Sequence, residues 1–178
     1  MTKDTRIEAD FLGEKEINND AYYGVQSLRA LENFPITGYR LNTDLIRALG
    51  MVKKAAAIGN HENGVLDEER KNAIVQASEE IIDGQWHSHF IVDPIQGGAG
   101  TSTNMNANEV IANRALDILG REKGDYDFVS PNNHVNMSQS TNDAFPTSLH
   151  IAFLIRAESL LETMNTMKQA FEAKATEF

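Results

Sequence analysis

The carboxyl-terminal segment carries the pattern that most limits the fold. From Thr147 to Phe178 the chain contains neither glycine nor proline. Apolar residues recur there at spacings of three, four or seven, which predicts one long α-helix. They are Leu149, Phe153, Leu160, Met164, Met167, Phe171 and Phe178. At about 1.5 Å per residue the helix would be about 45 Å long, more than a domain of this size needs.

The apolar stripe of this segment is too wide for a solvated surface helix, because Ile151, Leu154, Ile155 and Leu161 broaden it. We therefore expect the first helix of a larger helical bundle, cut after one element. A coiled-coil tail is the alternative. The expected division is an amino-terminal domain over residues 1–142 and the truncated bundle helix over residues 143–178.

The rest of the chain is mainly α-helical by its apolar periodicity. The segment from Arg6 to Ile17 is the only plausible strand region and reads as a short hairpin or an extended arm. Asn42 or Thr43 and Asp67 are predicted amino-terminal caps, and Gly64 and Gly84 are natural helix ends. The expected helices cover residues 23–31, 43–64, 67–84 and 104–120.

Charge and composition exclude several classes of protein. The 26 acidic and 16 basic residues give a formal net charge of −10, and the basic residues are scattered, which disfavours nucleic acid as a partner. The chain has no cysteine, so disulfides and thiolate metal sites are excluded. No signal peptide is recognisable, and no segment reaches the roughly 18 apolar residues of a membrane span. We expect a cytoplasmic protein without a membrane partner.

A glycine-rich segment, DPIQGGAGTSTNMNANE, runs from Asp93 to Glu109 into a predicted helix. Gly97, Gly98 and Gly100 allow positive φ or close approach to a ligand, and the free N–H groups of a helix start favour an anion. The segment lacks the lysine of a Walker phosphate loop and the G-x-G-x-x-G of a dinucleotide fold. It is a candidate carboxylate cradle, with an ordinary capped loop as the alternative.

A second polar helix start is SQSTNDAFPT, from Ser138 to Thr147. Five consecutive polar side chains exceed the single residue that a helix cap requires, and Pro146 is expected in the first helical turn. Ser140, Thr141 and Asn142 are neutral donors at a positive helix end, which suits a small dicarboxylate. We favour binding over capping alone.

Amides and a histidine fill the preceding stretch, SPNNHVNMS, which contains Asn132, Asn133, His134 and Asn136. A histidine in this setting can be a general base, an anion ligand or simply a hydrogen-bonded surface residue, and the last is the usual case. His87 and His89 lack a third ligand at a recognisable distance, so no metal site is expected.

Three stretches together resemble the amino-terminal part of the aspartase/fumarase superfamily, in the order and spacing of its members. They are DFLGEKEI with DAYYGVQSLRALENFPIT, then GGAGTSTNMNANEVIANRA, then SPNNHVNMSQSTNDAFPT. Ala99, Ser102, Met137 and Thr141 are more similar to the aspartase branch than to fumarases, which read nearer TGSGTQSNMNMNEV and HPNDHVNKSQSSND. Ser130 departs from the pattern, because many relatives carry histidine there.

The resemblance implies a fold, a reaction and a set of site residues. The fold is a helical amino-terminal domain with a short β-hairpin or arm, followed by the first long helix of a central bundle. The reaction is the reversible deamination of L-aspartate to fumarate and ammonia through an aci-carboxylate intermediate, without an organic cofactor, in a homotetramer. Thr101, Ser140, Thr141 and Asn142 would bind the substrate, and Asn132, Asn133 and His134 would form a secondary anion site.

One motif that the resemblance leads us to expect is missing. The base of the superfamily is a serine in a Gly-Ser-Ser-x-Met-Pro-x-Lys loop, and these 178 residues contain no such sequence. We therefore expect a fragment that is inactive alone, with no catalytic residue of its own. A fumarase, or a non-catalytic helical module that associates through its last helix, are the alternatives.

Overall fold

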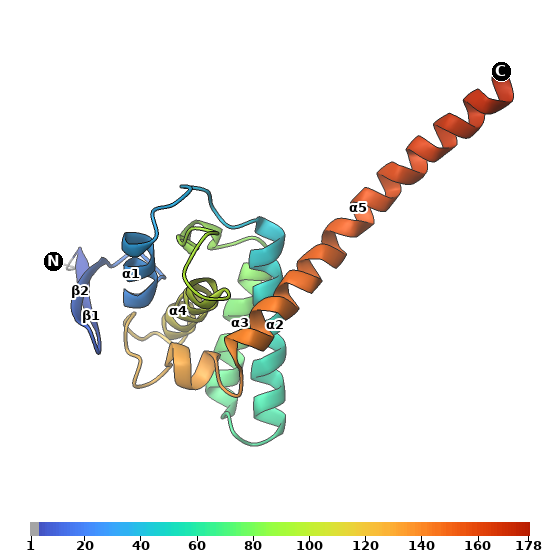
Figure 1. Ribbon diagram of the computed structural model, residues 1–178. Helices are drawn as coiled ribbons and strands as arrows, with labels where there is room; N and C mark the ends of the chain where they lie inside the picture. Colours follow the sequence, from blue (N-terminus) through green and yellow to red (C-terminus); the bar gives the residue numbers. More distant parts are fainter. Residues whose placement is uncertain (1–3) are drawn as a thin grey trace.

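The computed structural model describes residues 4–178 (Figure 1). A helical body carries a small hairpin on one side, and one long helix leaves the body on the other. The hairpin and the carboxyl terminus therefore lie at opposite ends of the molecule.

The hairpin consists of β1 (Thr5–Asp10) and β2 (Gly13–Asn18), paired antiparallel with Arg6 opposite Ile17. The extended arm is therefore the wrong alternative for this segment. Several hydrogen bonds fasten the hairpin to the body. For example, Arg29 Nε of α1 (Val25–Asn33) donates to Asp10 Oδ2 at 2.9 Å, and an Arg6 guanidinium nitrogen donates to the Ala21 carbonyl at 2.8 Å.

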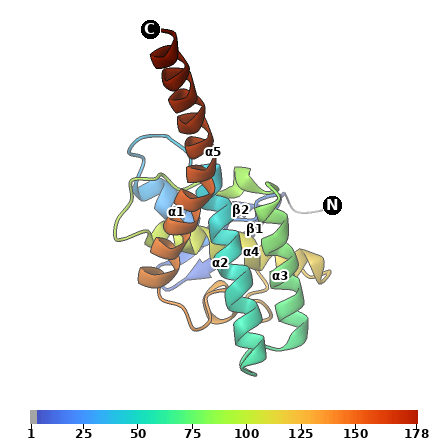
Figure 2. The ribbon, with the colours of Figure 1, turned by 90° about the vertical axis from the view of Figure 1, so that its right-hand side faces the viewer.

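Two helices, α2 (Thr43–Glu62) and α3 (Glu68–Ile82), lie side by side (Figures 1 and 2). The predicted caps are confirmed. The Asn42 side chain accepts from the Asp44 N–H at 2.8 Å, and the Asp67 side chain accepts from the Arg70 N–H at 2.9 Å. Local side-chain chemistry thus fixes where both helices begin.

The helix α4 (Thr101–Ile118) runs through the middle of the body, and most of its residues are buried. It packs against α1 and α3, with the short turns η1 (His87–His89) and η2 (Pro131–Val135) beside it. The predicted start at residue 104 was wrong by three residues. Gly100 takes a left-handed φ of 84° and stands in the cap position, so Thr101 already begins the helix.

The long helix is α5 (Thr141–Glu177), which starts two residues before the predicted boundary at residue 143 and six residues before the apolar pattern that begins at Thr147. Ser140 caps it by accepting from the Asn142 N–H at 3.2 Å. Pro146 is therefore the sixth helical residue, and its expected place in the first turn was wrong. The proposed division between residues 142 and 143 falls within the first turn of α5 and stays a prediction.

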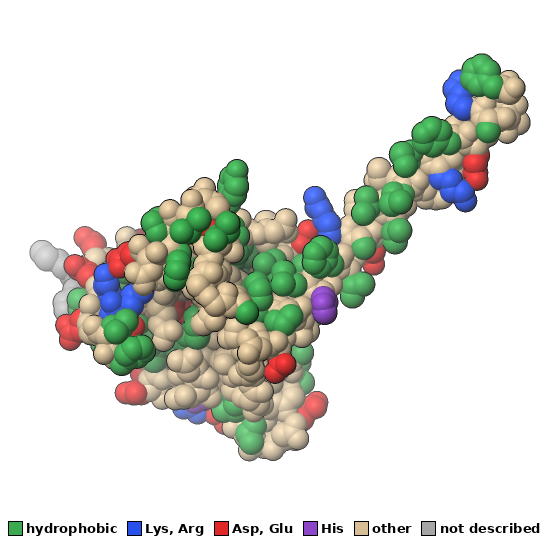
Figure 3. Space-filling model, viewed as in Figure 1, with side chains coloured by type: hydrophobic (Ala, Val, Ile, Leu, Met, Phe, Trp, Pro, Cys, Tyr) green, Lys and Arg blue, Asp and Glu red, His purple; other side chains and the backbone are tan. Residues whose placement is uncertain are grey.

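Only the first part of α5 packs on the body, mainly against α2. All residues from Glu158 to Phe178 are exposed, and apolar side chains follow this projecting part (Figure 3). Among the helices of residues 4–178, none combines the length and apolar character needed to cross a membrane.

Candidate functional site

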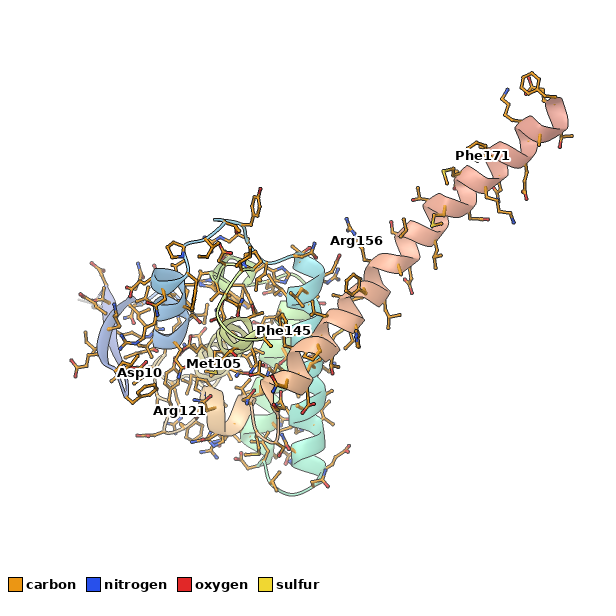
Figure 4. All side chains as sticks on the ribbon, in the orientation of Figure 1. Asp10, Met105, Arg121, Phe145, Arg156 and Phe171 are labelled. Atoms are coloured by element: carbon orange, nitrogen blue, oxygen red, sulfur yellow. The ribbon has the colours of Figure 1, made fainter. Side chains whose placement is uncertain are left out.

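The first turns of α4 and α5 meet at the surface of the body. Asn104 Nδ2 of α4 donates to Thr141 Oγ1 of α5 at 3.1 Å. A Cβ built on Gly100 would lie 2.3 Å from the Phe145 ring, so this ring fills the space over the glycine. Figure 4 shows Phe145 at the base of α5, where the helix rests on the body. The two polar helix starts identified in the sequence are therefore neighbours in space.

The glycine-rich loop before α4 is held by its own polar side chains. Asp93 accepts from the Thr37 N–H at 2.7 Å, the Gly38 N–H at 2.9 Å and the Ile95 N–H at 2.8 Å. Gln96 accepts from the Thr103 N–H at 2.8 Å and donates to Thr103 Oγ1 at 2.7 Å. These bonds fix the loop at both ends.

Two glycines of this loop have the positive φ that the sequence predicts for them. The φ of Gly98 is 76° and that of Gly100 is 84°, values that side chains with a Cβ rarely adopt. At Gly98 a Cβ would also lie 2.9 Å from Thr101 Oγ1. The close approach of the loop to Thr101 therefore depends on glycine.

An open pocket of about 570 Å³ separates the glycine-rich loop from α5. Asn142 is the predicted binding residue that lines it, together with Pro94, Ile95, Gln96, Gly98, Ala99, Gly100, Phe145, Pro146 and Leu149. The predicted cradle and the predicted donor thus border one cavity.

The four predicted binding residues occupy the two helix starts. Thr101 is the exposed first residue of α4, and Ser140 is the exposed cap of α5. Thr141 accepts from Asn104, and Asn142 is exposed at the pocket. Their roles in binding stay predictions.

The second predicted set lies on η2. Asn132 and Asn133 are exposed, and His134 is half-buried. The Ser130 N–H donates to His134 Nδ1 at 2.8 Å, and the Asn133 N–H donates to Ser130 Oγ at 3.1 Å. Burial, together with the Arg70 guanidinium, lowers the pKa of His134. A neutral imidazole that accepts at Nδ1 carries its proton on Nε2, so His134 can offer one neutral donor.

Sequence reasoning missed Lys53, which lies beneath both helix starts. Its Nζ donates to Asn104 Oδ1 at 2.7 Å, Gln139 Oε1 at 2.8 Å and Asn136 Oδ1 at 3.0 Å. Leu45, Leu49, Lys53 and Ala57 follow at intervals of four, and all are buried. A lysine on the apolar face of α2 was the signal that could have revealed it.

The arrangement offers neutral hydroxyl and amide donors, two helix amino termini and one buried ammonium. Both helix starts favour negative charge. Within residues 4–178 there is no group of three or more side chains that could hold a metal ion. The site is therefore suited to a small anion with several acceptor oxygens.

Comparison with known proteins identifies the family. A family model described as "Lyase" matches residues 13–178. An aspartate ammonia-lyase of Bacillus sp is 65% identical over 178 residues, which are 100% of this chain and 38% of that relative. A fumarate hydratase class II of Halobacterium salinarum is 50% identical over 177 residues, 99% of this chain and 36% of that protein.

A solved structure gives the same assignment. The crystal structure of fumarate lyase:delta crystallin from Brucella melitensis in native form is 53% identical, with a TM-score of 0.94 over 98% of this chain and 41% of that chain. The chain thus spans well under half the length of these relatives. Its sequence, from residue 13 to residue 178, and its fold show that the chain belongs to this lyase family, within the aspartase/fumarase superfamily.

Proposed function

We propose that this chain supplies one wall of the active site of an aspartate ammonia-lyase, which converts L-aspartate reversibly to fumarate and ammonia. The name of the 65% identical relative supports this reaction. The structural observation that carries the proposal is the hydrogen bond from Asn104 to Thr141. It joins the two helix starts that present Thr101, Ser140, Thr141 and Asn142.

The chemistry of these residues suits the proposed intermediate. Removal of a proton beside the β-carboxylate gives an aci-carboxylate with a second negative charge, and departure of ammonia then leaves fumarate. Donors fixed before the reaction stabilise the doubly charged intermediate more than the substrate, which is how electrostatic catalysis lowers a barrier. The hydroxyls, the Asn142 amide and the two helix starts act as such donors.

A secondary anion site on η2 belongs to the same proposal. Asn132 and Asn133 are exposed, and His134 carries a proton on Nε2 because its Nδ1 accepts from Ser130. Such neutral donors would hold an anion without a permanent ion pair.

Binding of fumarate to the 178-residue chain tests whether the two helix starts form part of a substrate-binding site. We expect fumarate to shift the NMR signals of Thr101, Ser140, Thr141 and Asn142. Thr141→Val removes the hydroxyl and should weaken binding about tenfold, the loss of one hydrogen bond to a charged group. Thr147→Val is the matched control, because Thr147 is exposed one to two turns further along α5. Equal fumarate affinities for Thr141→Val and wild type would contradict the assignment.

Turnover of L-aspartate and of L-malate distinguishes an aspartate ammonia-lyase from a fumarase. We expect the 178-residue chain to release no fumarate from L-aspartate, because it lacks the serine-base motif. If the reading frame continues past Phe178 into that motif, the longer protein should convert L-aspartate and not L-malate. Conversion of L-malate alone would favour the fumarase alternative, which the 50% identity to a fumarate hydratase supports.

Assembly is the last part of the proposal. The exposed apolar stripe of α5 would pack against helices of other copies in a homotetramer. Large apolar surfaces of this kind rarely stay in contact with water.

A further inference from the structure

Lys53 is the buried cation beneath the candidate site. Its side chain is completely buried, at 0% exposure, although it extends from the middle of α2. An ammonium group has three hydrogens, and each has an amide oxygen as its acceptor: Asn104 Oδ1, Asn136 Oδ1 and Gln139 Oε1. The cation is therefore fully hydrogen-bonded.

The charge of Lys53 has no carboxylate partner in residues 4–178. The groups that face Nζ, from α4 and from the turn before α5, are neutral amides. The adjacent Lys54, in contrast, pairs with Glu79 at 2.7 Å. The nearest turns carry Asp143 in α5 and His134 in η2, and neither is a partner of Lys53. Buried charges are usually paired, so this one is available to an anion bound above it.

The ammonium also sets the direction of a chain of hydrogen bonds. Because Asn104 Oδ1 accepts from Lys53, Asn104 Nδ2 is left as the donor end of the amide, and it donates to Thr141 Oγ1 at 3.1 Å and to Asn136 Oδ1 at 3.0 Å. The Thr141 oxygen thus accepts a hydrogen bond, and its own hydrogen has no acceptor among residues 4–178. That hydroxyl can donate outward to a ligand.

Hydrogen bonds from Lys53 also orient two amide side chains in the turn before α5. Asn136 Oδ1 and Gln139 Oε1 face Lys53, so their NH2 groups bind the backbone of the turn. Asn136 Nδ2 donates to the Gln139 carbonyl at 3.1 Å, and Gln139 Nε2 donates to the Val135 carbonyl at 2.9 Å. Asn136 Oδ1 also accepts from Asn104 Nδ2 at 3.0 Å and from Asn108 Nδ2 at 3.3 Å, so the ammonium and these two amides orient Asn136 together. Gln139 Oε1 accepts from the ammonium, so the orientation of the Gln139 amide in the turn before Ser140 depends on Lys53.

We propose that Lys53 is a positioning residue for a dicarboxylate ligand. Through Asn104 it turns the Thr141 hydroxyl outward as a donor, and its buried charge attracts the anion that this hydroxyl binds. This inference rests on the proposed function, because it takes the ligand to be the dicarboxylate of that reaction.

The proton on Lys53 should respond to the ligand. Burial lowers the pKa of Lys53 to about 7. A carboxylate bound at Thr141 favours the charged form and should raise that pKa, so that binding takes up a proton near neutral pH. Fumarate affinity should then fall as the pH rises and Lys53 loses its charge.

NMR titration of the isotope-labelled 178-residue chain tests both steps. Without ligand, the side-chain amide signals of Asn104, Asn136 and Gln139 should shift at the same midpoint pH as the Lys53 ε-carbon. With fumarate present, that midpoint should move to higher pH. Lys53→Met removes the charge at similar length and should weaken fumarate binding about tenfold or more. Lys54→Met is the matched control and should leave binding within about twofold, as for a partly exposed surface ion pair.

The outcomes separate this inference from the proposed function. The role of Lys53 would be overturned if the amide signals did not change when Lys53 loses its proton. It would also be overturned if a folded Lys53→Met chain bound fumarate with the affinity of the wild type. If Lys53→Met does not fold, the NMR titration of the wild-type chain alone tests whether the amides follow the protonation of Lys53. Amides that follow Lys53 in a chain that binds no fumarate would reject the dicarboxylate site itself, and with it the ligand assigned to Lys53.

Discussion

Asp93 shows how one carboxylate can hold the glycine-rich loop in place. It joins two segments that are far apart in the sequence by accepting from the backbone N–H groups of Thr37, Gly38 and Ile95. Burial opposes the ionised form, but the hydrogen bonds from Ile95, Thr37 and Gly38 together lower the pKa of Asp93 to about 2. The charged form is thus preferred in the folded chain.

This preference predicts an acid-sensitive contribution to stability. A carboxyl group whose folded pKa lies below its ordinary value stabilises the fold above that ordinary value and loses the effect as the pH falls. For Asp93 the window runs from pH 3.8 down to about 2. Asp93→Asn should lower the urea midpoint at neutral pH and flatten the loss of stability across this window. The exposed Asp83→Asn is the control, and parallel acid profiles for Asp93→Asn and wild type would contradict the assignment.

Lys53 is a second buried charged residue that joins distant segments of the chain, and its charge is positive. Its three acceptors come from residues 51, 83 and 86 positions away along the chain. A single buried group therefore links α2, α4 and the turn before α5. Its charge gives it a role that an apolar residue at the same position of α2 could not have.

The junction of α4 and α5 is a contact between elements that depends on one glycine. Gly100 combines a left-handed φ of 84° with a ring of Phe145 in the place where a Cβ would stand. The backbone of the α4 start can approach α5 only without a side chain there. The register of the two helix starts, and with it the candidate site, follows from this contact.

Substitution of Gly100 should therefore be costly. Gly100→Ala adds a strained φ and a steric clash, which together should lower the free energy of unfolding by about 2–5 kcal/mol. Gly59→Ala is the matched control, because Gly59 lies within α2 with nothing within 4 Å of its added Cβ. That change should stabilise the chain by about 0.5–1 kcal/mol. Urea unfolding measures both, and a Gly100→Ala chain as stable as the wild type would refute the contact.

At the level of the whole molecule, the exposed half of α5 is the dominant surface feature. Figure 4 places Phe171 far out on the projecting helix, away from the body, and Figure 3 shows apolar side chains along this part. Leu160 is 59% exposed, Met167 55% and Phe171 69%. An apolar stripe of this length is costly to hydrate.

We expect the 178-residue chain to associate through this stripe. The double substitution Leu160→Glu and Met167→Glu should reduce the mass measured by light scattering and leave the helical circular dichroism of the body in place. Thr166→Glu is the control, because at about 100° per residue it faces away from the stripe. A wild-type chain that stays monomeric at high concentration would argue against association.

The sequence predicted the features that depend on neighbouring residues. The caps at Asn42 and Asp67 are confirmed, since a cap needs only a side chain and an N–H two or three residues away. The pairing of β1 with β2 confirms the hairpin, and the continuous helix Thr141–Glu177 confirms the long helix that the apolar periodicity predicted. The start of α5 lies two residues before the predicted boundary at residue 143, because Ser140 in the predicted polar helix start provides the cap.

The candidate site was predicted in part. The motifs named Thr101, Ser140, Thr141 and Asn142, and the fold brings the two helix starts together. The supporting residues were not predicted. Asn104 and Gln139 have no sequence feature that separates them from other polar residues at helix starts, and for Lys53 the one signal was its place on the apolar face of α2.

By itself, then, the sequence determined that the chain is mainly helical, where its polar helix starts lie and which family it resembles, because caps, periodicity and motifs are encoded over short stretches of chain. Only the tertiary structure decided that Lys53 is buried, that Gly100 lies under Phe145 and that Asn104 contacts Thr141. The physical reason is that an amide or an ammonium takes its orientation from its hydrogen-bond partners. Those partners are neighbours only after the helices have packed.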